Sequence, residues 1–395
     1  MELMTTIKQK LLRFDYLMFI LVIGLSIFGV MMVGSATRIH LGASTAAFEN
    51  QQLWVISGAV LLLMAAFIDY KFIAKFYIVA YLVNILLLLT AAQFDITLGT
   101  GGVMRAVDVA GTGFSIQPSE FSKIFMILFM SALIERLGDK LNRPLYIAMI
   151  IALIMLPVVL IVIMPSLSAA VVVLVVSLSV LFVGGLSFKY IIPAVAVMVP
   201  ASYMFILDIS RGVQASRLVY LGLLQDYQVL RILPLVVPEE ATPESIRQTM
   251  QSIRAIGSGQ LVGQGFGEGT LNQLNYVAHS HNDFIFSVIG EELGYIGGIS
   301  VLAVLFVIVL KCLYTAFRAK TMTGRLLASG VGFMMAFQTF VNVGVAIGIL
   351  PNTGMVLPFI SYGGSSMWVN MAAIGLVINV GMEQPQKSAF SLFEE

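Results

Sequence analysis

A carboxylate and two histidines stand where a polar segment runs into a long apolar one. The string His279-Ser-His-Asn-Asp283 precedes an apolar run that contains Ser287, Glu291 and Glu292 at helical spacing. Acidic side chains at membrane depth are costly and usually functional, so Asp283 is a candidate catalytic group. Asp283 could equally cap the start of a helix. We expect Glu291 and Glu292 to pair with a basic residue and hold a helix bundle together.

A second polar string, Gln117-Pro-Ser-Glu-Phe-Ser-Lys123, opens another apolar run. Proline is favoured at the start of a helix, and Ser119 or Glu120 could serve the free amides there. Lys123 then lies about one turn into the membrane. It either snorkels to the headgroups or needs an anionic partner in a cavity, and Asp283 enters at the same depth.

Two glycine-rich segments complete the set of candidates. The run Arg254–Thr270 lacks the Gly-Lys-Ser/Thr ending of a phosphate-binding loop, although its exposed amides could hold an anion such as pyrophosphate. The run Leu350–Ser366 contains prolines and glycines that break a helix. Broken helix at membrane depth lines a cavity or is satisfied by neighbours, whereas small residues alone would serve close helix packing.

Composition indicates that the segments that carry these residues lie in a lipid bilayer and not in water. Of the 395 residues, 59% are hydrophobic and 11% charged, against about 25% charged in soluble domains. A net charge of +1 argues against nucleic acid as a partner, and the single Cys312 excludes an internal disulfide framework. Ten apolar segments of roughly spanning length predict an all-α polytopic membrane protein: Tyr16–Ser35, Leu53–Ile68, Phe76–Ala92, Phe121–Ile134 (starting near Gln117), Leu145–Ile163, Leu167–Phe182, Tyr190–Leu207, Phe284–Leu310, Leu326–Leu350 and Leu357–Met382.

Lysine and arginine positions predict the orientation. Placing the N-terminus in the cytoplasm puts most basic loop residues inside, and ten spans return the C-terminus to the same side. We therefore expect a single domain over residues 1–395, with spans 1–7 in 16–207, an extracytoplasmic loop in 208–282, spans 8–10 in 283–382 and a cytoplasmic tail in 383–395. The loop is polar and too long for a passive connector, so we expect an ordered, membrane-hugging active region there; a flexible insert is the alternative.

Four strings in this order resemble the SEDS family (shape, elongation, division and sporulation), which includes RodA, FtsW and SpoVE. They are Gln117-Pro-Ser-Glu-Phe-Ser-Lys123, Ala255-Ile-Gly-Ser-Gly259 with Gly263-Gln-Gly-Phe-Gly267, His281-Asn-Asp-Phe-Ile-Phe286 with Gly290-Glu-Glu-Leu-Gly294, and Leu357-Pro-Phe-Ile-Ser-Tyr-Gly-Gly-Ser-Ser366. The resemblance covers nearly the whole chain. Within the family, Phe67-Ile-Asp-Tyr70 and the short C-terminal tail favour a RodA-like member.

The resemblance implies a peptidoglycan glycosyltransferase of the bacterial cytoplasmic membrane. Such an enzyme polymerises lipid II beside a class B penicillin-binding protein, a transpeptidase, and the family's essential aspartate matches Asp283. That carboxylate could take the proton of the attacking hydroxyl as general base. Lys123, with Arg231 or Arg254, could neutralise the departing pyrophosphate, and we assign Glu120, Ser365 and Ser366 to substrate binding.

A metal and two other classes of function stay open. His279, His281 and Asp283 could bind a divalent cation such as Mg²⁺ or Mn²⁺, and a metal shared with substrate pyrophosphate is favoured over a dedicated cage. A flippase or transporter of a lipid-linked precursor would use intramembrane charges equally well. A non-catalytic scaffold for the transpeptidase is favoured by Ala106 in place of a usual Trp and Ser166 in place of an acidic residue, whereas Asp283 with Lys123 argues against it. The stretch from Val236 to Thr249 also departs from the family's pattern.

Overall fold

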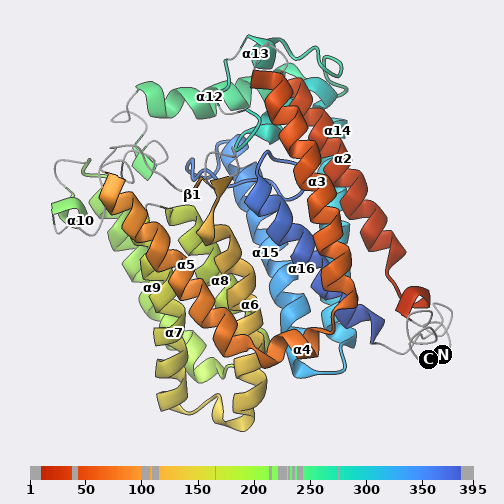
Figure 1. The fold of residues 1–395 in the computed structure, drawn as a ribbon. Helices are drawn as coiled ribbons and strands as arrows, with labels where there is room; N and C mark the ends of the chain where they lie inside the picture. The colour runs from red at the N-terminus through yellow and green to blue at the C-terminus, as the bar shows by residue number, and fades with distance from the viewer. Residues whose placement is uncertain are drawn as a thin grey trace, which may run out of the picture.

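The computed structural model describes most of the chain as a bundle of helices (Figure 1). The described residues are 10–37, 43–98, 107–108, 115–164, 166–212, 216–220, 229, 232–233, 236–237, 243–274, 276–278 and 280–383. Within them, the β structure is a single pair of two-residue antiparallel strands, β1 (Val107–Asp108) and β2 (Ser115–Ile116). The predicted all-helical class is therefore confirmed apart from this small hairpin.

Each of the ten predicted apolar segments overlaps one long helix. These helices are α2 (Tyr16–Ala36), α3 (Ala43–Phe67), α5 (Tyr77–Leu98), α6 (Pro118–Leu137), α7 (Pro144–Ile163), α8 (Leu167–Val183), α9 (Phe188–Ile209), α14 (Ile285–Arg318), α15 (Met322–Ala346) and α16 (Gly364–Met382). Seven of them, in the part of the chain that was described, are long and apolar enough to cross a membrane: α2, α3, α7, α9, α14, α15 and α16. The protein is thus a multi-pass membrane protein.

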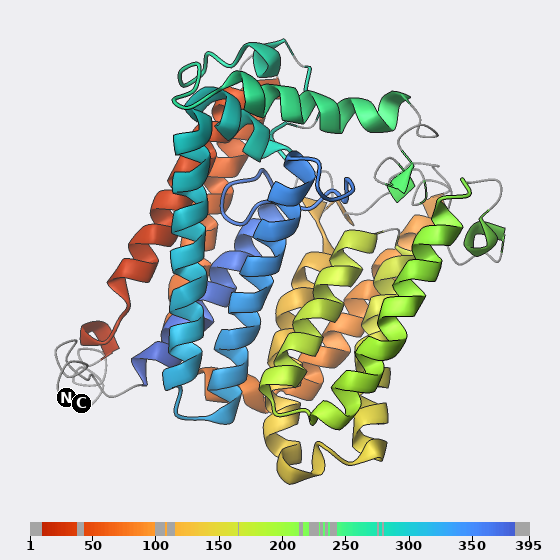
Figure 2. The same ribbon diagram turned by 180° about the vertical axis from the view of Figure 1, so that it is seen from behind.

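Short elements connect the long helices. At the end of the bundle where α2 begins lie α4 (Tyr70–Lys75) and a 3₁₀ turn (Gly138–Lys140). At the other end, the described parts of the predicted loop contain α10 (Arg217–Tyr220), α12 (Pro243–Ser258) and α13 (Thr270–Gln273). Helix α12 lies across this end of the bundle (Figure 2), so this part of the loop is ordered, as predicted.

Helix boundaries differ from the sequence expectation where special residues intervene. Helix α16 begins at Gly364, seven residues later than predicted, because residues 351–363 are not helical. Pro358 cannot donate a helical hydrogen bond and Phe359 has a φ of 66°, in the left-handed region. Helix α6 begins at Pro118, which confirms the predicted start near Gln117.

Two large hydrophobic cores divide the bundle, and a third, small cluster of described residues includes Ile209 at the end of α9. One large core is formed mainly by α2, α3, α14, α15 and α16. The other is formed mainly by α5, α6, α7 and α8. Helix α6 serves both, since Ile124, Ile127 and Leu128 face the first core while Met126 and Phe129 face the second. The start of α6 therefore lies where the two halves of the bundle meet.

Candidate active site

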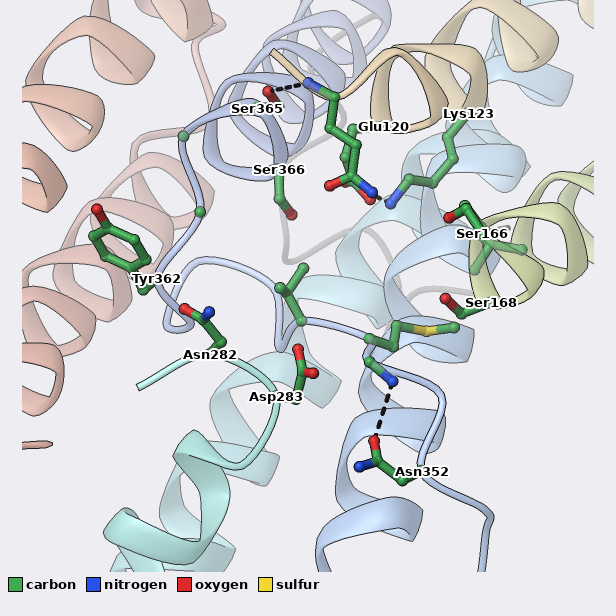
Figure 3. Close-up of a pocket in the computed structure, with 18 of the residues that line it drawn as sticks. Glu120, Lys123, Ser166, Ser168, Asn282, Asp283, Asn352, Tyr362, Ser365 and Ser366 are labelled. Carbon is green, nitrogen blue, oxygen red and sulfur yellow. Dashed lines mark hydrogen bonds and ion pairs between the residues drawn. The ribbon is translucent and has the colours of Figure 1, made fainter. Parts of the chain in front are cut away.

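A pocket of about 420 Å³ lies between the two halves of the bundle, at the same end as α12, whose Gln248 lines it. Figure 3 shows the residues around it. The pocket collects most of the sequence candidates. The residues that line it are Gln117, Glu120, Lys123, Ser166, Ser168, Ala169, Val172, Gln248, Asn282, Asp283, Asn352, Gly354, Met355, Val356, Tyr362, Gly363, Gly364, Ser365 and Ser366. The pocket thus combines charged, amide, hydroxyl and aromatic side chains within one bundle end.

Four helices begin at this pocket. Their first residues or the residues just before them line it: Gln117 before α6, Ser166 before α8, Asp283 before α14 and Gly363 before α16. The first amide groups of a helix have no partner within the helix, and the helix dipole places partial positive charge there. Four such ends around one cavity create a site that favours an anionic ligand.

Lys123 is buried and paired within its own helix. Its ammonium group lies 2.6 Å from the carboxylate of Glu120, one turn earlier, and the residue is 2% exposed. The snorkelling alternative is therefore wrong, and the expected anionic partner exists but is Glu120. Lys123 and Asp283 border the same pocket from different helices. The ion pair keeps the Lys123 ammonium group at the pocket wall, where the Glu120 carboxylate compensates most of its positive charge.

Asp283 stands in a turn immediately before α14, and its carboxyl group faces the pocket (Figure 3). The residue at the cap position is Phe284, whose side chain makes no cap, and Asp283 stands one residue before it, so the capping role considered for Asp283 stays a prediction. The side-chain amide of Asn342 fixes this turn. It donates to the carbonyl of Asp283 at 2.8 Å and to the carbonyl of Met355 at 2.7 Å. Asn342 thereby ties the Asp283 turn to the segment before α16.

The segment 351–363 enters the bundle as irregular backbone, and neighbours satisfy it. The side-chain amide of Gln51 on α3 donates to the carbonyl of Ser361 at 3.1 Å and accepts from the amide of Gly363 at 3.4 Å. The hydroxyl of Ser365 accepts the backbone N–H of Gln117 at 3.0 Å, which joins the starts of α16 and α6. The predicted break in the helix is confirmed, and the segment forms one wall of the pocket.

The glycine-rich run and the residues that follow it are hydrogen-bonded to α14. Glu291 accepts the backbone amides of Leu271 at 2.6 Å and Asn272 at 3.0 Å. Glu292 accepts the amide of Gly267 at 3.0 Å and the hydroxyl of Ser35 at 2.5 Å. The expected pairing with a basic residue is therefore wrong for Glu291 among the described residues, and it stays a prediction for Glu292. Within the run, the amide of Gly267 is donated to a carboxylate, and the amides of Gln264 and Gly265 are donated to the backbone carbonyls of Glu291 and Glu292, each at 3.0 Å.

Glycine is required in this run because the chain passes within contact distance of α14. A methyl group on Gly259 would lie 1.9 Å from the carbonyl oxygen of Gly290. At Gly263, with a φ of 84°, it would lie 2.1 Å from the carbonyl oxygen of Glu292. The backbone of α14 leaves helical geometry at Gly294, with a φ of 67°, where the run packs against it. The loop is thus clamped to the helix that Asp283 precedes.

We predict that Gly259→Ala destabilises the protein by about 1–3 kcal/mol, because the added methyl group overpacks a backbone contact. Gly257→Ala is the matched control, since nothing lies within 4 Å of the added atom. The control should leave stability unchanged or raise it by up to about 1 kcal/mol, as alanine favours helix. Thermal unfolding of both variants in detergent measures the difference. Equal transition temperatures would show that the contact does not hold the loop.

Four of the predicted site residues are not among the residues that line the pocket, and one of these, His281, instead contacts the ring of Tyr362. Arg254 is exposed on α12 and does not line the pocket. Arg231 and His279 lie outside the described residues. Where the chain is described, no group of three or more His, Cys, Asp or Glu residues could hold a metal. Because His279 is not among those residues, the His279, His281 and Asp283 cluster stays a prediction.

Several pocket residues were not singled out from sequence. Asn282 and Tyr362 lie inside strings that were recognised, but their side chains gave no signal of their own. Gln248 on α12 and Asn352 face the pocket together, with 3.0 Å between the amide nitrogen of Asn352 and the amide oxygen of Gln248. Only a folded chain brings these two distant amides into contact. Ser166, noted as a departure, does line the pocket.

Fold and pocket together define a multi-pass membrane protein whose anion-favouring pocket at one bundle end contains a carboxylate and a buried lysine. A family model of cell cycle proteins, FtsW/RodA/SpoVE, matches residues 15–386. The chain belongs to this family.

Curated relatives carry two names. The chain is 32% identical over 382 residues to a probable peptidoglycan glycosyltransferase FtsW of Geobacter metallireducens, which covers 94% of this chain and 96% of the relative. It is also 32% identical over 368 residues to the peptidoglycan glycosyltransferase MrdB of Escherichia coli, covering 93% of each. Relatives of both names match, so the preference for a RodA-like member stays a prediction.

Solved structures show the same fold. A chain from a study titled "Structural coordination of polymerization and crosslinking by a peptidoglycan synthase complex" superposes with a TM-score of 0.74 at 25% identity, covering 95% of this chain and 99% of that one. Thermus thermophilus RodA superposes with a TM-score of 0.62 at 24% identity, covering 95% and 98%. The second likeness supports the fold alone.

Proposed function

We propose that this peptidoglycan glycosyltransferase uses the pocket to polymerise lipid II into β-1,4-linked glycan strands. The observation that carries the proposal is the meeting, in one cavity, of the Asp283 carboxyl group with four helix N-termini and Lys123. A carboxylate can accept a proton, and the helix ends favour an anionic leaving group. Glycosyl transfer from a sugar pyrophosphate needs both.

The proposed reaction is a single displacement with inversion. The 4-hydroxyl oxygen of the acceptor GlcNAc bonds to the anomeric carbon of the donor MurNAc. The bond from that carbon to the pyrophosphate oxygen breaks, and its electron pair leaves with undecaprenyl pyrophosphate. The hydroxyl proton passes to Asp283. An α-linked donor becomes a β-linked product, with no oxidant or other co-reactant.

The pyrophosphate would bind on the Lys123 side of the pocket. The ammonium group of Lys123 and the first amides of α6, α8 and α16 would stabilise the charge that develops on it. Glu120 would hold Lys123 in place through their 2.6 Å ion pair. Ser365 and Ser366, in the first turn of α16, would contribute hydroxyls to binding. Arg254 does not line the pocket and we assign it no part.

The arrangement in the membrane is also a proposal. Ten spans, with loop 208–282 outside and both termini in the cytoplasm, would place the pocket at the outer face of the bacterial cytoplasmic membrane. The start of α2 and the end of α16 lie at the same bundle end, opposite the pocket, which supports an even number of spans (Figure 1). Residues 1–395 would form a single membrane domain, and a class B penicillin-binding protein would crosslink the product.

A flippase of a lipid-linked precursor is the second candidate function. Its substrate site would lie near the bilayer midplane, between internal repeats. The pocket instead lies at one end of the bundle, beside α12, and this position favours polymerisation over transport.

The test is strand formation by the purified full-length protein from labelled lipid II in detergent. Polymer that a β-1,4-specific muramidase degrades would support the proposal. The assay is run alone and with a class B penicillin-binding protein and Mg²⁺ or Mn²⁺. Failure to form polymer under every condition would overturn it and favour the flippase.

A further inference from the structure

Tyr362 forms the pocket wall across from Lys123, beside Asn282 (Figure 3). It belongs to the irregular segment before α16, is half-buried and is one of the residues that line the cavity. The transfer reaction as proposed leaves this aromatic side chain without a part. Its position on the other side of Asp283 from the Lys123–Glu120 pair raises the question of which substrate group it meets.

The ring is held in place from two directions. The ring of Trp54 on α3 lies 4.7 Å from it, centre to centre, at 51°. The ring of His281 meets it edge-on at 5.5 Å. The backbone N–H of Tyr362 also donates to the carbonyl of His281 at 3.0 Å, which links it to the Asp283 turn. Tyr362 is therefore a rigid aromatic surface fixed relative to Asp283.

Asn282 offers a polar group beside this ring. Its side-chain oxygen is shielded from solvent, and no donor among the described residues reaches it. A buried acceptor without a partner is costly, so a bound ligand or water normally supplies the missing donor. Because Asn282 lines the pocket, a rotation of its amide group would bring this oxygen to an N–H or hydroxyl of a ligand lying on the ring.

We propose that Tyr362 and Asn282 form the subsite for the acceptor sugar, an N-acetylated pyranose. This inference rests on the proposed function and names where its second substrate binds. A pyranose ring presents a face of C–H groups with partial positive charge, and the face of an aromatic ring is negative. The sugar stacks on Tyr362, donates a hydrogen bond to Asn282, and holds its attacking hydroxyl toward Asp283. The donor pyrophosphate then occupies the opposite, Lys123 side.

The acceptor subsite is tested by binding, without catalysis. The probe is the soluble disaccharide pentapeptide of lipid II, which lacks the pyrophosphate and lipid. The chain has two tryptophans, Trp54 and Trp368, so full-length Trp368→Phe protein reports Trp54 alone. A saturable change in its fluorescence is expected, because Trp54 packs on Tyr362. No saturable change would overturn the proposal.

Variants made in the Trp368→Phe protein distinguish stacking on the aromatic ring from simple side-chain packing. Tyr362→Phe keeps the aromatic face and should bind the probe as the parent does. Tyr362→Leu should raise the half-saturating concentration about tenfold. If Phe weakens binding as much as Leu, or Leu binds as the parent does, the aromatic subsite is wrong. Thermal unfolding confirms that each variant is folded. Should Leu fail to fold, Asn282→Ala decides, since unchanged binding there also overturns the proposal.

Polymerisation distinguishes failure of this inference from failure of the function. Tyr362→Leu should raise the lipid II concentration at half-maximal rate and shorten the strands, with a smaller effect on the maximal rate. Polymer from the native protein with strands of equal length from Tyr362→Leu would reject the subsite and keep the function. No polymer from the native protein would reject the function, while the disaccharide titration still decides whether Tyr362 binds the sugar.

Discussion

Asp283→Asn should lower the rate of strand formation by about 10²- to 10⁴-fold, which is the usual contribution of a general base. Asparagine keeps the shape of the side chain but cannot accept the proton of the acceptor hydroxyl. The carbonyl of Asp283 that Asn342 holds is a backbone group and is unaffected by the change. The turn before α14 should therefore remain intact. Gel analysis of labelled lipid II measures the rate.

Two controls make this result specific to proton transfer. Glu268→Gln removes an exposed carboxylate from the glycine-rich run Arg254–Thr270, and Glu268 does not line the pocket. The Glu268→Gln protein should therefore polymerise lipid II at the native rate. The Asp283→Asn protein should also bind lipid II with native affinity, because the proposed proton transfer acts in the transition state. Equal strand formation by Asp283→Asn and native protein would remove Asp283 from the mechanism.

The sequence predicts the helices well because long apolar runs and breaking residues are local signals. Hydrophobic length located all ten long helices, and the prolines and glycines of Leu350–Ser366 indicated the irregular segment. Helix ends were less accurate. Helix α3 begins at Ala43, ten residues before the apolar run, since polar residues such as Glu49 and Gln51 extend it.

The hydrogen bonds and ion pairs between distant segments of the bundle could not be predicted from the sequence. Glu291 of α14 was expected to meet a cation, yet it accepts two backbone amides, because the chain that follows the glycine-rich run approaches closely enough to donate them. The partner of Lys123 is three residues away, and local spacing alone could have indicated it. The Gln248–Asn352 contact depends on how α12 lies over the bundle, for which the sequence has no local signal.

Lys123→Met should also have a large effect, and this effect should appear first as a loss of stability. Glu120 is 7% exposed and would remain buried without its cation. Removing one partner of a buried ion pair typically costs about 3–5 kcal/mol. Thermal unfolding in detergent should show this loss. The exposed pair of Lys71 and Glu383, 2.9 Å apart, is the matched comparison, and Lys71→Met should cost at most about 1 kcal/mol.

The double variant Glu120→Gln/Lys123→Met separates the structural role of Lys123 from its catalytic one. It removes both charges, so most of the lost stability should return, since neutral replacements of a buried pair are often tolerated. Strand formation should nevertheless stay about 10²- to 10³-fold slower, the usual cost of losing one group that stabilises transition-state charge. A stable double variant that polymerises at the native rate would limit Lys123 to structure, and charge stabilisation of the pyrophosphate would then rest on the helix N-termini.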